Sequence, residues 1–298
     1  MDSGAGDGAT VLAGLVGRGI QGSRSPSLHM QEAAAQGVTL TYALLDLDAP
    51  PWQSATLAQA LDGAESGGFC GVNVTYPFKQ AVIALLHELS PDAERLGAVN
   101  TVVFQGGRRI GHNTDWAGFA ESFRRGLPGA PRRQVVQVGA GGAGAAVAYA
   151  LLSEGVERLV LFDTDRARAE SVTGRLEALF GPGRAVAGDD LGASVAGACG
   201  VVNATPVGMT KHRGTPVPAA LLRPDLWVAD VVYVPLETEL LAAARATGCR
   251  TLDGGGMTVF QAAGAFRLFT GLEPDADRMR AAFLRSVAAG ALGPLEVT

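Results

Sequence analysis

Lysine is scarce in this chain of 298 residues, where only Lys79 and Lys211 are lysines among 24 basic residues. Acidic residues outnumber basic ones, and the net charge of −5 argues against partners such as nucleic acid or an anionic membrane. No run of 18 apolar residues is present, so no membrane-spanning helix is expected. Residues 1–9 have neither the basic nor the apolar segment of a signal peptide, and we expect a cytoplasmic protein.

Cysteine is also rare, with Cys70, Cys199 and Cys249 far apart and each within an apolar stretch. An odd number at this spacing predicts reduced thiols in the core and not a disulfide framework or a zinc site. No group of His, Cys and acidic residues has metal-ligand spacing, so we expect no metal. His29 and His112 are expected to line the edge of a site.

Hydrophobic residues make up 47% of the chain, and short apolar runs alternate with helical patterns in two sections. The first section predicts strands at 10–17, 42–48 and 71–75, a hairpin over 98–112 and a helix over Pro77–Leu89. After a Pro/Gly/Arg connection at 126–133, strands alternate with crossover helices, which indicates a parallel sheet covered on both faces. Two helical segments, 257–269 and 275–289, stand apart from that alternation. The predicted fold class is α/β with two domains.

A glycine-rich turn follows the first strand of the second section. The turn is Gly139-Ala140-Gly141-Gly142-Ala143-Gly144, which matches G-x-G-x-x-G between an apolar strand and an Ala-rich helix. Such glycines let the backbone approach a pyrophosphate, which binds at the positive helix end. Asp163, 19 residues beyond Gly144, ends the next strand, where a carboxylate binds ribose hydroxyls and repels a 2′-phosphate. The predicted cofactor is NAD, although Arg166 and Arg168 nearby leave a phosphate-binding alternative open.

Four polar strings in the first section lie at or near the ends of the predicted strands. They are Ser23–Pro26, Asn73–Lys79, Ala98–Thr101 and Asn113–Asp115. Open α/β sheets bind ligands at this edge. The hydroxyl, amide, ammonium and carboxylate groups of these strings suit a small polyhydroxylated acid.

Lys79 is the residue in these strings best suited to proton transfer. Oxidation of a secondary alcohol requires removal of the hydroxyl proton, which a lysine can accept and return. Arginine stays protonated, so a lysine in a chain that otherwise uses arginine points to chemistry. Asp115 is expected to cap a helix at 116–126 and also to bind the substrate.

The strings SRSP, NVTYPFK, GAVNT, GHNTD, GAGGAG, NATPVG and GMTVFQA, in this order, resemble the shikimate dehydrogenase family. The resemblance runs from Val11 to Arg285 and is strongest to the NAD-dependent quinate/shikimate dehydrogenases of bacteria. It implies a substrate-binding domain at 1–115, completed by helices at 256–298, and a Rossmann-type domain at 116–255. The active site is then expected in the cleft between the two domains.

The resemblance also implies a role for individual residues. The expected carboxylate ligands are Ser23 and Ser25, and the expected catalytic pair is Lys79 and Asp115. The residues expected around the substrate ring and the nicotinamide are Asn73, Thr75, Asn100, Asp115, Tyr233, Gln261, Asn203, Thr205, Val231, Gly254 and Met257.

The implied reaction is reversible hydride transfer between NAD and the ring C3 alcohol of shikimate or quinate, which gives 3-dehydroshikimate or 3-dehydroquinate. Ser25 favours shikimate without excluding quinate, because one contact changes preference by only ~1–3 kcal/mol. The alternatives are an aminoshikimate or aminoquinate dehydrogenase and a non-catalytic NAD-binding regulatory paralogue. A folate-linked methylene dehydrogenase shares the two-domain plan and a catalytic lysine, but it would not need the Ser23 and Ser25 pair, and its own substrate strings are missing from this chain. The expected assembly is a monomer or homodimer, and an NAD-linked enzyme is expected to run in the oxidative direction.

Overall fold

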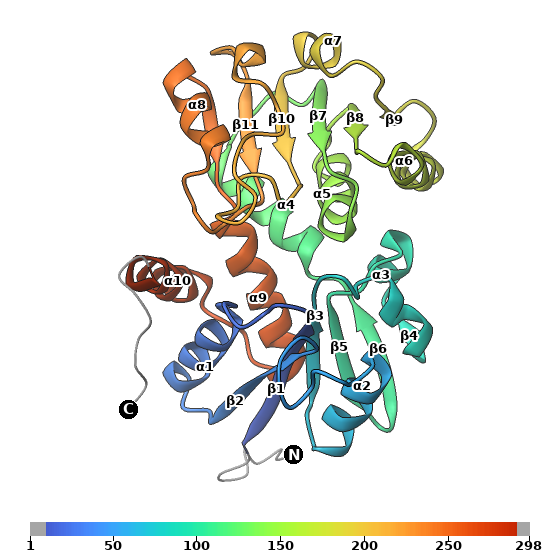
Figure 1. The fold of residues 1–298 in the computed structure, drawn as a ribbon, viewed down its shortest axis with the longest axis vertical. Helices are drawn as coiled ribbons and strands as arrows, with labels where there is room; N and C mark the ends of the chain where they lie inside the picture. The colour runs from blue at the N-terminus through green and yellow to red at the C-terminus, as the bar shows by residue number, and fades with distance from the viewer. Residues whose placement is uncertain (1–9, 291–298) are drawn as a thin grey trace, which may run out of the picture. The chain divides into compact units, whose positions relative to one another are not determined.

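The structure is a computed structural model that describes residues 10–290 (Figure 1). Of these, residues 10–114 and 262–290 form one compact unit, called unit 1, and Asp115–Gln261 form unit 2. Each unit contains a six-stranded sheet. The predicted α/β class with two domains is confirmed, including the return of C-terminal helices to the first unit.

Unit 1 has the sheet order β2-β1-β3-β5-β6-β4. β1 runs parallel to β2 and β3, and β5 runs antiparallel to β3 and β6. The predicted hairpin is β5–β6, whose turn places both Gly106 and Gly107 at positive φ, as a tight hairpin turn requires. The elements are β1 Val11–Gly17, α1 Ser25–Ala35, β2 Leu40–Asp46, α2 Leu57–Ser66, β3 Gly71–Val74, η1 Ala81–Leu85, β4 Glu88–Leu89, α3 Pro91–Leu96, β5 Thr101–Gln105, β6 Arg108–His112 and α10 Ala276–Gly290.

The helix predicted over Pro77–Leu89 is wrong. Pro77 lies in a turn, and only a short 3-10 helix, η1, and the strand β4 follow it. Tertiary pairing overrides the local helical pattern here, since the His87 N–H donates to the Arg109 carbonyl at 2.9 Å and β4 pairs with β6. Lys79 therefore lies in a turn and not on a helix face.

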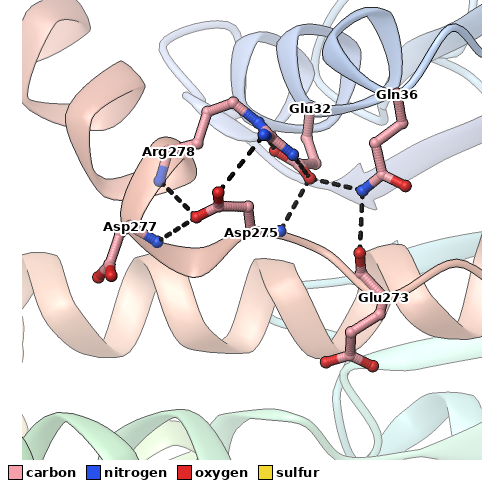
Figure 2. A network of polar contacts seen from close by, with 6 residues as sticks. All are labelled: Glu32, Gln36, Glu273, Asp275, Asp277 and Arg278. Atoms are coloured by element: carbon pink, nitrogen blue, oxygen red, sulfur yellow. Dashed lines mark hydrogen bonds and ion pairs between the residues drawn. The ribbon is translucent and has the colours of Figure 1, made fainter.

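The C-terminal segments complete the core of unit 1. Phe266 and Phe269, on the last turns of α9 (Gly255–Thr270), are buried in one cluster with Ala13 and Leu15 of β1. A polar network also joins α10 to α1 (Figure 2). The carboxylate of Glu32, fully buried, accepts from Arg278 Nε at 2.8 Å and Nη2 at 2.6 Å and from the Asp275 N–H at 2.9 Å.

Further contacts extend this network at its two ends. Gln36 Nε2 donates to Glu32 Oε1 at 2.7 Å and to the Glu273 carbonyl at 3.0 Å (Figure 2). The backbone N–H of Asp277 donates to the Asp275 carboxylate at 3.0 Å. The C-terminal end of helix α1, which begins at Ser25, is therefore held to α10 and to the residues just before it.

Unit 2 has a fully parallel sheet in the order β12-β11-β10-β7-β8-β9. Read from the other edge, this is the 3-2-1-4-5-6 order of a doubly wound dinucleotide-binding fold. The strand order reverses between β7 and β10, where such folds bind ligands. The elements are α4 Asp115–Gly126, β7 Gln134–Val138, α5 Gly142–Ser153, β8 Arg158–Phe162, α6 Arg166–Phe180, β9 Ala185–Ala187, α7 Leu191–Ala196, β10 Gly200–Asn203, η2 Ala219–Leu221, β11 Trp227–Asp230, α8 Glu239–Thr247 and β12 Arg250–Leu252.

Among residues 10–290, no helix is both long and apolar enough to cross a membrane.

Candidate active site

The glycine-rich turn of unit 2 lies between β7 and the start of α5, at the point where the strand order reverses. Gly139 has φ +105°, and a Cβ there would lie 2.5 Å from the Ala204 carbonyl oxygen. A Cβ on Gly144 would lie 2.2 Å from the Gly139 carbonyl oxygen, so α5 packs directly on the turn. A Cβ on Gly141 would meet nothing within 4 Å. The first and third glycines thus allow close packing, and the second leaves the space that a pyrophosphate needs.

Gln137, which was not predicted from the sequence, lies in β7 and forms hydrogen bonds to this turn. Its side chain is fully buried, and its Nε2 donates to the carbonyls of Gly139 at 2.8 Å and Gly144 at 2.7 Å. The signal in the sequence is a polar residue in the interior of β7, whose other polar residue, Gln134, is the first of the strand. The turn is therefore held in shape by the protein itself.

Asp163 follows β8 and lies against the same turn. Its Oδ2 accepts from the Ala140 N–H at 2.8 Å, and its Oδ1 accepts from the Asp165 N–H at 2.9 Å. Arg168 pairs with the same carboxylate at 3.5 Å, and Arg166 pairs with Glu170 and Asp189. Both arginines that could hold a phosphate thus have carboxylate partners in this structure.

The ends of β10 and β11 form a second polar group in unit 2. Asn203 is fully buried; its Oδ1 accepts from the N–H and hydroxyl of Thr205, and its Nδ2 donates to Asp230 Oδ1 at 2.9 Å. Asp230 also accepts from the Val232 N–H at 3.0 Å and the Thr238 hydroxyl at 2.8 Å. Burial raises the pKa of Asp230 to about 6, against the lowering effect of these hydrogen bonds. Asp230, which was also not predicted from the sequence, links through its hydrogen bonds the two loops that carry Thr205 and Val231.

The remaining predicted residues of unit 2 follow β11 and β12. A Cβ on Gly254 would lie 2.3 Å from the Val231 carbonyl oxygen, so these two predicted cofactor residues lie side by side. Tyr233 is half-buried in the loop after β11. Met257 and Gln261 lie on α9, where a Cβ on Gly118 of α4 would meet the Met257 carbonyl oxygen and the Gln261 backbone nitrogen.

In unit 1 the predicted carboxylate ligands lie at the start of α1. Ser23 and Ser25 are half-buried, and the Ser25 N–H donates to Ser23 Oγ at 3.2 Å. The loop that carries them is held by Asp46 at the end of β2. Its buried carboxylate accepts from the N–H groups of Gly19 at 2.9 Å and Ile20 at 3.1 Å. Asp46 was not predicted from the sequence.

The other predicted substrate residues of unit 1 lie within or after β3, or just before β5. Asn73 and Asn100 are buried, and Thr75 and Lys79 are half-buried. The Lys79 carbonyl accepts from the Val99 N–H at 2.8 Å, which holds the lysine turn against the segment that leads into β5. Asp115, the first residue of α4, is buried and belongs to unit 2.

His29 is not at the edge of a site, and this expectation is wrong. The residue is fully buried on α1, and its ring stacks on Tyr42 with 4.7 Å between ring centres. Phe266 and Phe269 also contact the ring, and neither ring nitrogen has a hydrogen-bond partner. Burial without a partner lowers the pKa of His29 to about 3.

The cysteines are free thiols, of which Cys249 is buried while Cys70 and Cys199 are only partly so. Within the part of the chain that the structure describes, no three His, Cys, Asp or Glu side chains are grouped as metal ligands would be.

The strand order, the glycine turn at the reversal point and the carboxylate after the next strand define a dinucleotide-binding α/β protein. Comparison with known proteins narrows this class. Residues 15–102 match the shikimate dehydrogenase substrate-binding domain, and residues 254–282 match the shikimate 5′-dehydrogenase C-terminal domain.

Individual relatives match over nearly the whole chain. A shikimate dehydrogenase (NADP(+)) of Streptomyces avermitilis is 55% identical over 91% of this chain and 94% of its own. A quinate/shikimate dehydrogenase (NAD(+)) of Corynebacterium efficiens is 51% identical over 92% of this chain and 98% of its own length. The structure of quinate dehydrogenase from Corynebacterium glutamicum in complex with NAD matches with a TM-score of 0.89 and 49% sequence identity. The match covers 93% of this chain and 99% of that chain. The chain therefore belongs to the shikimate dehydrogenase family.

Proposed function

We propose that this protein is an NAD-dependent dehydrogenase that oxidises the ring C3 alcohol of shikimate or quinate reversibly, giving 3-dehydroshikimate or 3-dehydroquinate. The observation that carries the cofactor choice is the placement of Asp163. Its carboxylate accepts directly from the Ala140 N–H of the glycine turn, and both neighbouring arginines have acidic partners. A negative charge at this place repels a 2′-phosphate and suits the free ribose hydroxyls of NAD.

The residues of unit 2 fit such a dinucleotide. The open space at Gly141 and the start of the 12-residue helix α5 would receive the pyrophosphate, and Asp163 the ribose. Thr205, Val231 and Gly254 follow the strands β10, β11 and β12, on the same sheet edge as the glycine turn, and would hold the nicotinamide. When bound, the nicotinamide supplies the hydride acceptor for alcohol oxidation.

The residues of unit 1 fit a small hydroxylated acid. Ser23 and Ser25 would bind its carboxylate beside the positive end of α1. Asn73, Thr75 and Asn100 would bind ring hydroxyls, together with Asp115, Tyr233 and Gln261 of unit 2. The relatives from Corynebacterium that share half of the sequence are named for quinate and shikimate, which supports this substrate class.

Lys79 would take the hydroxyl proton during oxidation and return it during reduction. Its backbone is anchored through Val99, so the side chain starts from a fixed point. Asp115 would hold the reacting hydroxyl and complete the catalytic pair. Removal of a proton-transfer group of this kind costs roughly 10²–10⁴-fold in rate.

Initial rates with shikimate and quinate, each paired with NAD⁺ and NADP⁺, test the proposal. We expect turnover with NAD⁺ and at least one of the two acids, and rates with NADP⁺ well below those with NAD⁺. Equal or faster rates with NADP⁺ would contradict the role given to Asp163. The two lysines provide a matched pair: Lys79→Met should abolish most turnover while cofactor binding persists, and the exposed Lys211→Met should change neither.

A further inference from the structure

A chain of buried hydrogen bonds runs across the sheet of unit 1 and includes two of the predicted substrate residues. It involves Tyr42 of β2, Asn73 of β3, Thr101 of β5 and Asn100 just before it. All four side chains are buried, and Thr101 is 0% exposed. The role of Tyr42 and Thr101 is not accounted for by the proposed chemistry, since neither was expected to contact substrate or cofactor.

Two backbone groups determine the direction of every bond in this chain. The Thr114 N–H can only donate, so the Asn100 atom 2.8 Å from it is Oδ1. The Asn100 carbonyl can only accept, so the Asn73 atom 3.3 Å from it is Nδ2. The orientations of both amide groups follow from these two contacts.

The hydroxyl protons are then assigned as well. Tyr42 must donate to Asn73 Oδ1 at 2.7 Å, and Asn73 Nδ2 donates to Thr101 Oγ1 at 2.9 Å. Thr101 in turn donates to Asn100 Oδ1 at 3.0 Å, and Asn100 Nδ2 donates to Thr114 Oγ1 at 2.9 Å. Each group thus donates to the next, from Tyr42 to Thr114. Both N–H groups of Asn73 are used inside the protein.

Tyr42 lies inside unit 1, where burial raises the pKa of its hydroxyl, so the hydroxyl keeps the proton that it donates to Asn73. The ring itself is held by stacking on His29.

We propose that Tyr42 and Thr101 are positioning residues of the substrate site, which act together with the Thr114 N–H to hold the Asn100 amide in one orientation through this directed chain. The inference rests on the proposed function, in which Asn100 binds a ring hydroxyl. Neither residue needs to touch the substrate. Loss of either hydroxyl leaves a buried amide without one of its partners and lets it turn, so the substrate loses a correctly oriented hydrogen bond.

Two variants at residue 101 and one control variant distinguish a positioning role from a packing role. Thr101→Val keeps the shape and removes the hydroxyl, whereas Thr101→Ser keeps the hydroxyl and removes a methyl group. We expect Thr101→Val to lower kcat/KM for shikimate or quinate by roughly 10- to 100-fold, with KM for NAD changed by less than about 2-fold. Thr101→Ser should retain most of the wild-type value. The control Thr173→Val removes a buried hydroxyl from α6 that, among residues 10–290, donates to the Glu170 carbonyl, and it should leave both parameters unchanged.

Tyr42→Phe provides an independent test at the other end of the chain, in case Thr101→Val does not fold. It removes one oxygen and keeps the ring that stacks on His29. It should raise KM for the acid without raising KM for NAD. If both residues act through the Asn100 amide, the double variant should lose less than the product of the two single effects.

Three results would overturn the inference. Equal losses in Thr101→Val and Thr101→Ser would show a packing role, and wild-type kinetics in both Thr101→Val and Tyr42→Phe would show no role. Wild-type protein that oxidises neither acid would overturn the proposed function itself and the inference with it. The wild-type rates therefore distinguish failure of the function from failure of the positioning role.

Discussion

Replacement of His29 by leucine should make unit 1 more resistant to acid. The imidazole is fully buried among aromatic rings, and both of its nitrogens lack hydrogen-bond partners. Burial lowers its pKa from 6.5 to about 3, so between these values the unfolded chain binds a proton that the folded protein does not. The stability associated with His29 is therefore complete above pH 6.5 and is lost as the pH falls towards 3.

The magnitude follows from the two pKa values. Each pH unit between them costs about 1.4 kcal/mol, so by pH 5 the wild type should have lost about 2 kcal/mol through this residue and by pH 4 about 3 kcal/mol. Leucine has a similar volume and does not titrate. The free energy of unfolding of His29→Leu, relative to wild type, should rise by these amounts on acidification.

Urea unfolding of both proteins at pH 8, 6.5, 5 and 4 measures this difference. Acidic groups shared by the two proteins contribute equally and cancel. The exposed His212→Leu is the matched control, for which no such growth is expected. A His29→Leu difference that stays constant from pH 8 to pH 4 would refute the reasoning, because it would mean that His29 is protonated in the folded protein or is not buried.

Four further substitutions test the two units. Gly144→Ala should destabilise unit 2 by about 1–3 kcal/mol and weaken NAD binding, because its Cβ would lie 2.2 Å from the Gly139 oxygen. Gly174→Ala, in the interior of α6 with nothing within 4 Å, should instead stabilise by up to about 1 kcal/mol; thermal melts and NAD titrations compare the two. Burial raises the pKa of Asp230 from 3.8 to about 6, so its stabilising contribution is present below 3.8 and lost as the pH rises through 6. Unfolding at pH 4 and 7 should therefore show wild type losing about 2 kcal/mol relative to Asp230→Asn over that range. Asp46→Asn should raise KM for the acid roughly tenfold and leave KM for NAD unchanged, because the loop that carries the carboxylate ligands loses charged hydrogen bonds.

The parts of the fold that the sequence predicts well are those with local signals. The glycine turn, its flanking strand and helix, and the β5–β6 hairpin follow from glycine spacing and apolar periodicity. The segment from Pro77 to Leu89 shows where such signals fail. Its helical pattern is overridden by the pairing of β4 with β6, a contact between residues about twenty positions apart.

The polar residues expected to contact ligands were predictable from the sequence, but the residues that hold them in place were not. Residues that follow strands, such as Ser23 and Asp163, are noticeable because packing of the apolar core does not require polar side chains at these positions. Gln137 and Asp230 are polar residues within or at the end of buried strands, and their hydrogen-bond partners come close to them only when the backbone folds. His29 was misplaced because a lone histidine in a helix does not reveal which face is buried.

The return of residues 262–290 to unit 1 has a consequence for the order in which the protein is made. Phe266 and Phe269 fill the same core as β1, and Arg278 pairs with the buried Glu32 of α1, so unit 1 cannot close until these residues leave the ribosome. Synthesis of the intervening segment takes on the order of 10–30 s at cellular elongation rates. Unit 2 is continuous in sequence and can fold during that interval. The N-terminal part of unit 1, with its apolar strands exposed, cannot complete its core until the C-terminal residues have been synthesised.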